Sequence, residues 1–328
     1  MSARTAVVTG ATGFLGLNLV EELLGQGWEV VALHRDPAAA ERLERLGTEP
    51  VRADILDPDS LVQAIPEHAD AVFHVAGDTS MWARHRDRQH RVNVEGTRNV
   101  VRASMARGVG RLVHTSSVAV YGFHDGVITE DLSHLGEGSW ITYLRTKALA
   151  EREVRAGIVG GLDAVILNPA NIVGRYDIRN WARMFTIVAS GKLPGAPPGE
   201  GSFAHVRAVA RAHVAARERG RTGENYLLGG VDATYRDVVE RIGGLVGREG
   251  PVRVTPCWLL HLLGRASTGI ARFTGKEPDI TPEAVAIVCA RLVCSSRKAV
   301  EELGYRPEPL EAMLADCHAW LAEQGLLG

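Results

Sequence analysis

The chain has 328 residues, of which 45% are hydrophobic, so it is long enough to bury a large core. Its 37 lysines and arginines nearly balance its 39 aspartates and glutamates, which leaves no strong field to attract nucleic acid or an anionic membrane. We therefore expect a small-molecule partner, with no nucleic acid and no membrane.

The spacing of the cysteines and histidines and the length of the apolar runs argue against a metal site and against a membrane-spanning segment. The four cysteines lack the C-x-x-C spacing of zinc or redox sites, and the twelve histidines form no H-E-x-x-H cluster, so we expect no metal. Apolar runs such as Trp258 to Leu263 fall short of the ~20 residues that a membrane span requires. No secretory leader is visible before the first predicted strand, and we expect a cytoplasmic location.

Short β-rich segments alternate with helical ones through the first half of the chain. The spacing of polar and apolar residues predicts a helical stretch from Arg88 to Arg107, and good helix formers predict another from Trp140 to Val154. This alternation predicts an α/β protein with a Rossmann-type doubly wound parallel sheet. The predicted strands are Ala6–Val8, Glu29–Leu33, Ala71–His74, Arg111–Thr115 and Ala164–Leu167.

The pattern changes after Asn168. Residues 191–202 are crowded with Gly and Pro and are predicted to form a loop, whereas Asn225–Leu228 resembles a late strand. From Tyr235 onward the sequence is mostly helical. We predict a dinucleotide-binding domain at 1–170, to which 203–230 returns, and a smaller, mostly helical C-terminal substrate lobe made of 171–202 and 231–328.

Three glycines, Gly10, Gly13 and Gly16, stand between the first strand and an amphipathic helix. The first permits a tight turn, the second lets the backbone approach a pyrophosphate, and the third allows close packing of helix and strand. The amides at the helix N-terminus would attract the anion. The other loop residues predicted to bind the dinucleotide are Thr12, Phe14 and Leu15.

The end of the second predicted strand bears on the choice of dinucleotide. An acidic residue there would bind the ribose hydroxyls of NAD, but this chain has His34 and Arg35. The guanidinium of Arg35 suits the 2′-phosphate of NADP. We therefore favour NADP, while Asp36, one residue further on, leaves NAD open.

Tyr143 and Lys147 stand four residues apart in a helical segment, so they share a face. A free tyrosine titrates near pH ~10, and a neighbouring ammonium is expected to lower that pKa. The pair is predicted to transfer a proton. Ser116 and Ser117 follow a predicted strand end, where ligands bind in such sheets.

These motifs together resemble the extended short-chain dehydrogenases/reductases, a family that includes sugar-nucleotide epimerases, dehydratases and dihydroflavonol-4-reductase-like enzymes. The resemblance begins with T-G-A-T-G-F-L-G and continues through A-D-I-L-D, H-V-A-G, V-N-V-E-G-T, S-S-V-A-V-Y-G, Y-L-R-T-K and N-P-A-N-I-V-G. It covers nearly the whole chain.

The resemblance assigns roles to individual residues. It implies that Ser117 and Tyr143 hold the substrate oxygen during hydride transfer, and that Tyr143 transfers the proton. Lys147 would also hold the nicotinamide ribose, with Asn93 near it. Asp54 would hold the adenine amino group. The remaining cofactor contacts that the resemblance implies are Ile55, Val75, Ala76, Gly77, Asn168 and Pro169.

The substrate class follows from what is missing as well as from what is present. Val118 and Ala119 replace the acidic pair of dehydratases, and Gly201 and Ser202 replace the Arg-Asp pair of epimerases. The chain is most similar to the dihydroflavonol-reductase or 3β-hydroxysteroid-dehydrogenase-like branch. This implies NADP(H)-dependent hydride transfer at a carbonyl or secondary alcohol of a hydrophobic molecule, in an enzyme that we expect to be a homodimer.

Several residues are predicted to contact that substrate: Asp78, Ser80, Trp82, Asn171, Trp181 and Phe185. Arginines at 175, 179 and 183 could instead pair with a diphosphate, so a nucleotide-sugar epimerase with tightly bound NAD stays an alternative. A dinucleotide sensor without turnover is a remote third alternative. Such proteins usually lack the Tyr or the Lys, and this chain has both.

Overall fold

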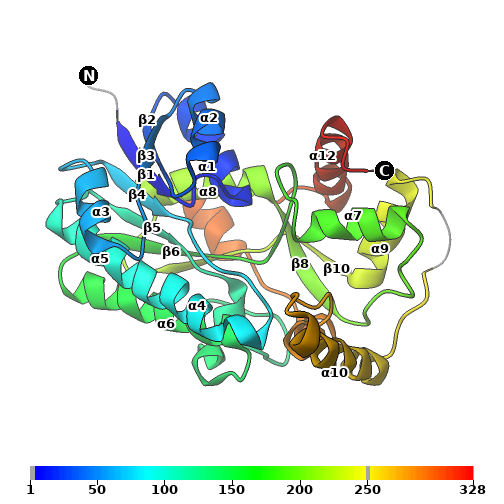
Figure 1. Cartoon of the computed structure of the whole chain (residues 1–328). Coiled ribbons are helices and arrows are strands. Elements are labelled where there is room, and N and C mark those ends of the chain that lie inside the picture. Colours follow the sequence, from blue (N-terminus) through cyan, green and yellow to red (C-terminus); the bar gives the residue numbers. More distant parts are fainter. Residues whose placement is uncertain (1–3, 249–251, 328) are drawn as a thin grey trace.

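A seven-stranded parallel sheet, in the order β3-β2-β1-β4-β5-β6-β9, runs through the larger of two lobes in the computed structural model, which describes residues 4–248 and 252–327 (Figure 1). Because the strand order reverses between β1 and β4, a crevice is expected at their carboxyl ends. The predicted doubly wound sheet is confirmed, and each predicted strand is present. The strands are β1 (Thr5–Thr9), β2 (Glu29–His34), β3 (Glu49–Arg52), β4 (Ala71–His74), β5 (Leu112–Thr115), β6 (Ala164–Pro169) and β9 (Asn225–Leu228).

Helices cover both faces of this sheet because its strands are apolar on both sides. One face packs against α1 (Phe14–Gly25) and α8 (Val206–Arg219). The other packs against α3 (Pro58–Ala64), α5 (Gly96–Ala106) and α6 (Thr142–Val159), while α2 (Pro37–Arg45) lies beside β2 and β3.

The helical stretch predicted at 88–107 is confirmed, with one irregularity. It comprises α4 (Arg86–His90), a π-helical turn at Arg91–Glu95, and α5. The π turn contains Asn93. Single π turns are rare and occur mostly at functional sites.

The smaller lobe is mostly helical, as predicted, and also contains a small sheet in which β8 pairs with three strands. Its strands are β7 (Asn171–Val173), β8 (Glu200–His205), β10 (Val231–Thr234) and β11 (Arg291–Leu292). Its helices are α7 (Trp181–Ala189), α9 (Tyr235–Leu245), α10 (Cys257–Thr274), α11 (Pro282–Val288) and α12 (Leu310–Glu323). A π turn at Ala299–Leu303, between α11 and α12 in the chain, instead packs against α8 and β9 in the core of the larger lobe.

The loop predicted at 191–202 is wrong at its end. Residues 200–202 begin β8, where Glu200 pairs with Thr234 and Ser202 pairs with Asp232 of β10. The Gly and Pro residues at 191–199 favour a loop in the local pattern, and β10, one of the three partners of this strand, lies about 30 residues later in the chain. The division of the chain at residue 170 stays a prediction; α8 and β9 lie on the large sheet and β8 lies in the small one.

The described residues contain neither a membrane-spanning helix nor a cluster of potential metal ligands. Among helices in that part of the chain, none combines the length and apolar character needed to cross a bilayer. The same residues contain no group of three or more potential metal-ligating side chains.

Candidate active site

The loop between β1 and α1 has the backbone shape that its glycines predict. Gly10 has φ +69°, and a Cβ there would come within 2.7 Å of the amide nitrogen of Ala76. A Cβ on Gly16 would lie 2.1 Å from the carbonyl oxygen of Gly10. No side chain caps α1 at Gly13, so the amides of Phe14 and Leu15 in its first turn stay available to an anion. This cradle fits a dinucleotide pyrophosphate.

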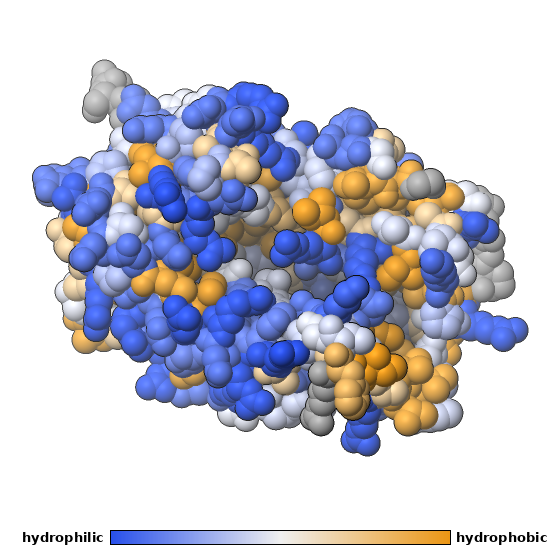
Figure 2. Space-filling model, in the orientation of Figure 1, coloured by the Kyte–Doolittle hydropathy of each residue, from blue (hydrophilic) through white to orange (hydrophobic). Residues whose placement is uncertain are grey.

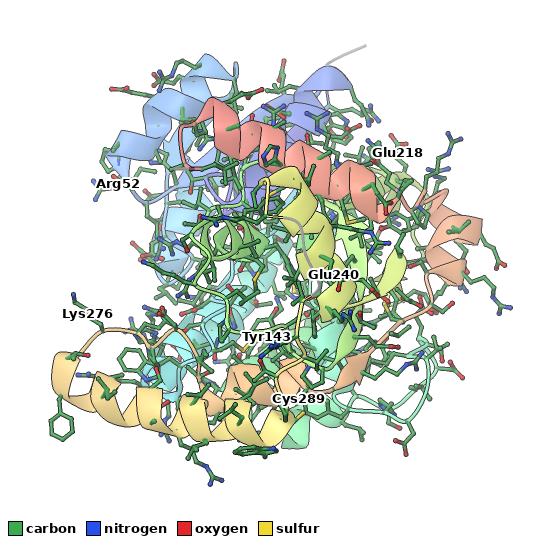
Figure 3. All side chains as sticks on the ribbon, turned by 90° about the vertical axis from the view of Figure 1, so that its right-hand side faces the viewer. Arg52, Tyr143, Glu218, Glu240, Lys276 and Cys289 are labelled. Carbon is green, nitrogen blue, oxygen red and sulfur yellow. The ribbon has the colours of Figure 1, made fainter. Side chains whose placement is uncertain are left out.

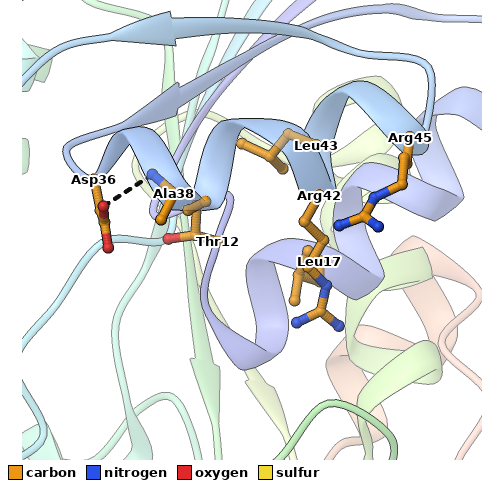
Figure 4. Close-up of a pocket in the computed structure, with 8 residues that line it drawn as sticks. Thr12, Leu17, Asp36, Ala38, Arg42, Leu43 and Arg45 are labelled. Atoms are coloured by element: carbon orange, nitrogen blue, oxygen red, sulfur yellow. Dashed lines mark hydrogen bonds between the residues drawn. The ribbon is translucent and has the colours of Figure 1, made fainter.

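A cavity of about 380 Å³ adjoins this loop beyond the carboxyl end of β2 (Figure 4). Thr12, Asp36, Arg42 and Arg45 are among its lining residues. One oxygen of Asp36 accepts a hydrogen bond of 3.0 Å from the amide of Ala38 and so caps α2. Arg35 is exposed and is not among the lining residues. Sequence reasoning therefore missed Arg42 and Arg45, whose signal was two basic residues three apart in the helix after β2.

The two residues implied for the adenine lie beyond β3. Asp54 accepts a 3.0 Å hydrogen bond from the amide of Leu56 and is half-buried. Ile55 is buried against Gly96, where a Cβ would lie 2.6 Å from its Cδ1. Both follow the same edge of the sheet as the glycine loop.

Tyr143 lies in the first turn of α6 and is half-buried within the molecule (Figure 3). Burial raises the pKa of its phenol above the usual value, and hydrogen bonding by Ser117 offsets part of that rise. The structure therefore brings Ser117 and Tyr143 together. The predicted lowering of the Tyr143 pKa by Lys147 is wrong for this structure, because desolvation dominates.

The Lys147 side chain is directed at the end of β5. Its ammonium donates a 2.7 Å hydrogen bond to the carbonyl oxygen of Thr115, which stands two residues before Ser117. Burial lowers the pKa of Lys147 to about 8, although the carboxylate of Glu151 acts in the opposite direction. A Cβ on Gly77 would lie 4.0 Å from the Lys147 Nζ, which places the end of β4 beside it.

Asn93 ties the segment after β4 to α6. Its Oδ1 accepts from the amide of Asp78 at 2.7 Å, and its Nδ2 donates to the carbonyl of Asp78 at 3.0 Å and to Thr146 Oγ1 at 3.1 Å. Val75 and Ala76 are held by β1 through the carbonyl and hydroxyl of Thr9. Asn93 therefore fixes the segment that follows β4 against α6.

Asn168 belongs to a buried polar network behind Ser117. Its Nδ2 lies 3.1 Å from the carbonyl oxygen of Ser117 and 2.7 Å from Glu151 Oε1, and its Oδ1 accepts from Asn225. Pro169 ends the same strand. This network positions the serine, and Glu151 in it was not predicted, because its partners lie on β6 and β9.

The residues predicted to contact substrate divide into two groups, of which the first lies near Tyr143. Ser80 and Trp82 line a small space together with Tyr143 and Glu283. The carboxylate of Asp78, by contrast, is paired with Arg88 at 2.7 Å.

The second group packs within the smaller lobe. Asn171 donates to the Ser202 carbonyl at 3.1 Å. Trp181 stacks on Tyr235 with centroids 5.7 Å apart, and Phe185 is fully buried in the core beneath α12. Phe185 therefore serves packing.

Helix α11 of the smaller lobe packs against the same apolar cluster as Tyr143. Ala286 and Ile287 of that helix pack with Tyr143, Met81 and Ile141 in one apolar cluster. Sequence reasoning missed these contacts because α11 follows Tyr143 by more than 130 residues. Figure 2 shows the surface hollowed between the two lobes.

Comparisons with known proteins agree with this geometry. Residues 6–229 match the model of the NAD dependent epimerase/dehydratase family. The chain is 32% identical over 328 residues to "Sterol demethylase protein B" of Methylococcus capsulatus (strain ATCC 33009 / NCIMB 11132 / Bath), covering 98% of this chain and 100% of that protein. It is 30% identical over 335 residues to the "3-beta-hydroxysteroid dehydrogenase" of Mycolicibacterium neoaurum, covering 95% and 89% of the two chains.

Among solved structures, that of gox2253 superimposes with a TM-score of 0.83 at 32% identity and covers 98% of both chains. The sequence and the fold of this chain thus both match one family. The same chain contains the glycine cradle, the Ser117–Tyr143 pair and the buried Lys147. The chain belongs to the NAD dependent epimerase/dehydratase family of extended short-chain dehydrogenases/reductases, and it is an NAD(P)-dependent enzyme of that family.

Proposed function

We propose that this enzyme reduces a ketone or aldehyde of a hydrophobic molecule, or oxidises the corresponding alcohol, with NADP(H) and by a Ser-Tyr-Lys mechanism. The observation that carries the proposal is the meeting of Ser117 and Tyr143 above the buried ammonium of Lys147. The bound nicotinamide would supply or accept the hydride.

The proton chemistry suits reduction. Because burial raises the pKa of Tyr143, its phenol keeps its proton at neutral pH. With Ser117 it can donate a hydrogen bond to a carbonyl oxygen and then give up the proton as that oxygen gains charge. Lys147 stays cationic below about pH 8 and stabilises negative charge that develops nearby.

The walls around Tyr143 support a hydrophobic substrate. Met81, Trp82 and Ile141 line a small space with Tyr143, and Ile287 of α11 packs against the same apolar cluster as Tyr143. Apolar surfaces of this kind stabilise a bound molecule by roughly 25 cal/mol per Å² buried. The names of two relatives, a sterol demethylase protein and a 3-beta-hydroxysteroid dehydrogenase, point to the same substrate class.

The choice of NADP rests on the cavity at the adenosine end. Arg42 and Arg45 line it, and the exposed Arg35 precedes it. Guanidinium groups pair well with a phosphate. Asp36 also lines the cavity and keeps its negative charge while it accepts a hydrogen bond from the Ala38 amide, but the two arginines outnumber it there.

The test is turnover of Tyr143→Phe with a panel of apolar carbonyl compounds and NADPH. We expect the variant to lose more than about 99% of activity while its NADPH affinity stays near that of the wild type, because one hydroxyl is removed and little volume changes. Retention of more than about a tenth of wild-type activity would contradict the assignment. Tyr121→Phe, at a buried phenol in a separate apolar cluster, is the matched control and should keep its activity.

A nucleotide-sugar epimerase with NAD is the second candidate, favoured by the arginines near the smaller lobe. Arg183 is paired with Asp279, and Arg175 stacks on Tyr176. Of the three arginines, Arg179 is the exposed one for which the structure describes no side-chain partner. Titration with UDP and UDP-glucose in the presence of NADP distinguishes the candidates. Micromolar binding would favour the epimerase. The homodimer and the cytoplasmic location stay predictions.

A further inference from the structure

Helix α10 exposes large apolar side chains that a folded protein normally buries. The exposed fractions are 69% for Trp258, 58% for Leu262, 65% for Ile270 and 94% for Phe273. Figure 2 shows apolar residues gathered at the lower right, where Figure 1 places α10. A contiguous exposed apolar patch of this kind marks an interaction site.

The exposed residues form one stripe along the helix. At 100° per residue, Trp258, Leu262 and Phe273 lie within about 60° of one another, and Ile270 borders them. The opposite side holds the buried Leu260, and a Cβ on its Gly264 would lie 3.2 Å from the backbone of Thr281, just before α11. The stripe therefore faces outward and is not part of the core.

The charge of this segment is of one sign. Residues 257–276 contain no Asp or Glu but include Arg265, Arg272 and Lys276, although the whole chain has a net charge of −2. Arg265 is exposed and lies about 60° from Leu262 around the helix, at the border of the stripe. In Figure 3 α10 forms the lower edge of the molecule, with Lys276 following its outer end.

We propose that α10 docks the enzyme on the surface of an anionic phospholipid bilayer, with its axis in the membrane plane. An apolar stripe with aromatic residues at both ends, bordered by basic residues, is typical of helices that lie at this interface. Anionic headgroups complement the basic border. Such a helix does not span the bilayer, in keeping with the absence of a spanning helix among the described residues.

The nearly balanced charge of the whole chain led us to expect no membrane partner, and the proposed docking departs from that expectation. The local charge of α10 differs from that balance. Docking there would also hold the site near the bilayer, because α10 packs on α11, and Ile287 of α11 packs against the same apolar cluster as Tyr143. The docking itself does not depend on which molecule is reduced.

Vesicle co-sedimentation of the full chain tests the proposal. We expect binding to phosphatidylcholine vesicles that contain phosphatidylglycerol, and at least about tenfold weaker binding to phosphatidylcholine alone. Trp258→Ser with Phe273→Ser should weaken binding to the mixed vesicles about tenfold or more, because both rings lose their apolar contact. Arg265→Glu should weaken binding to the mixed vesicles only. Val159→Ser, at a 91% exposed site at the end of α6, is the control and should bind as the wild type does.

Other results would overturn the proposal. One is no binding to mixed vesicles; another is equal binding by the wild type and the double variant. A third is self-association of the wild type that the double variant abolishes, without vesicle binding, which would make the stripe an interface between copies. Turnover of a water-soluble carbonyl compound by the α10 variants should equal that of the wild type, so failure of docking and failure of the proposed function are distinguishable.

Discussion

Lys147 occupies an interior position at which its charge depends on one acidic neighbour. Burial lowers its pKa to about 8, and Glu151, one helical turn later, favours the ammonium. Glu151 is itself held by the amides of Asn168 and Asn225. The protonation of Lys147 is therefore coupled to the network that positions Ser117.

We expect Glu151→Gln to move the alkaline limb of the kcat/KM profile to lower pH, by about one unit. Lys147 loses its charge as pH rises through its pKa, and removing a carboxylate that favours the charged form lowers that pKa further. The measurement is the pH dependence of kcat/KM from neutral to alkaline pH. Glu153→Gln on the same helix removes a carboxylate paired with Arg98 and should leave the limb in place. An unmoved limb in Glu151→Gln would rule out the coupling.

The 2′-phosphate of NADP is expected to pair with arginine side chains at the adenosine end of the site. Arg42→Ala and Arg35→Ala should each weaken NADPH binding about tenfold, since a charged hydrogen bond contributes about 1.5–3 kcal/mol. NADH affinity, measured by the same fluorescence titration, is the internal control and should not change. If Arg35→Ala alone had the effect, the cavity lined by Arg42 would not hold the phosphate. Equal affinity of the wild type for both dinucleotides would contradict the NADP preference.

At the scale of single elements, α1 begins where its loop leaves no room for a side chain. A Cβ on Gly16 would meet the backbone of Gly10 at 2.1 Å, whereas a Cβ on Gly25, at the other end of α1, meets nothing within 4 Å. The same residue type thus has opposite consequences in one helix. The two glycines differ because Gly16 packs against the glycine loop that precedes the helix, whereas Gly25 lies far from that loop.

We expect Gly16→Ala to lower the free energy of unfolding by about 1–3 kcal/mol and to weaken cofactor binding, because the loop must shift. Gly25→Ala is the matched control and should stabilise the protein by about 0.5–1 kcal/mol through helix propensity. Urea unfolding and dinucleotide titration measure both effects. Wild-type stability and cofactor affinity in Gly16→Ala would show that the close approach is not required.

At the scale of the whole molecule, the candidate site is assembled from both lobes. The larger lobe contributes the glycine loop, Ser117, Tyr143 and Lys147, while α11 of the smaller lobe packs against the same apolar cluster as Tyr143. The smaller lobe is held by its own sheet and by a separate apolar core under α12. The chemistry is thus built on the large sheet, and the smaller lobe shapes the space above it.

The parts of this protein that depend on short spacing could be predicted from the amino-acid sequence. The alternation of strands and helices, the three glycines after β1, and the Tyr143–Lys147 interval are local patterns, because each is set by the geometry of one strand, turn or helix. These predictions of the large sheet and its first loop agree with the structure. The Tyr143–Lys147 interval likewise falls in a single helix, α6.

The surroundings of the glycine loop and of the Tyr143–Lys147 pair became visible only in the folded structure. The pKa of Tyr143 rises because the fold buries it, and the Lys147 ammonium finds Thr115 on a strand 32 residues earlier. Phe185 turned inward because α12 covers it, and the strand at 200–202 formed because β10 pairs with it. Burial and pairing between distant segments are properties of the packed chain, so local spacing could not reveal them.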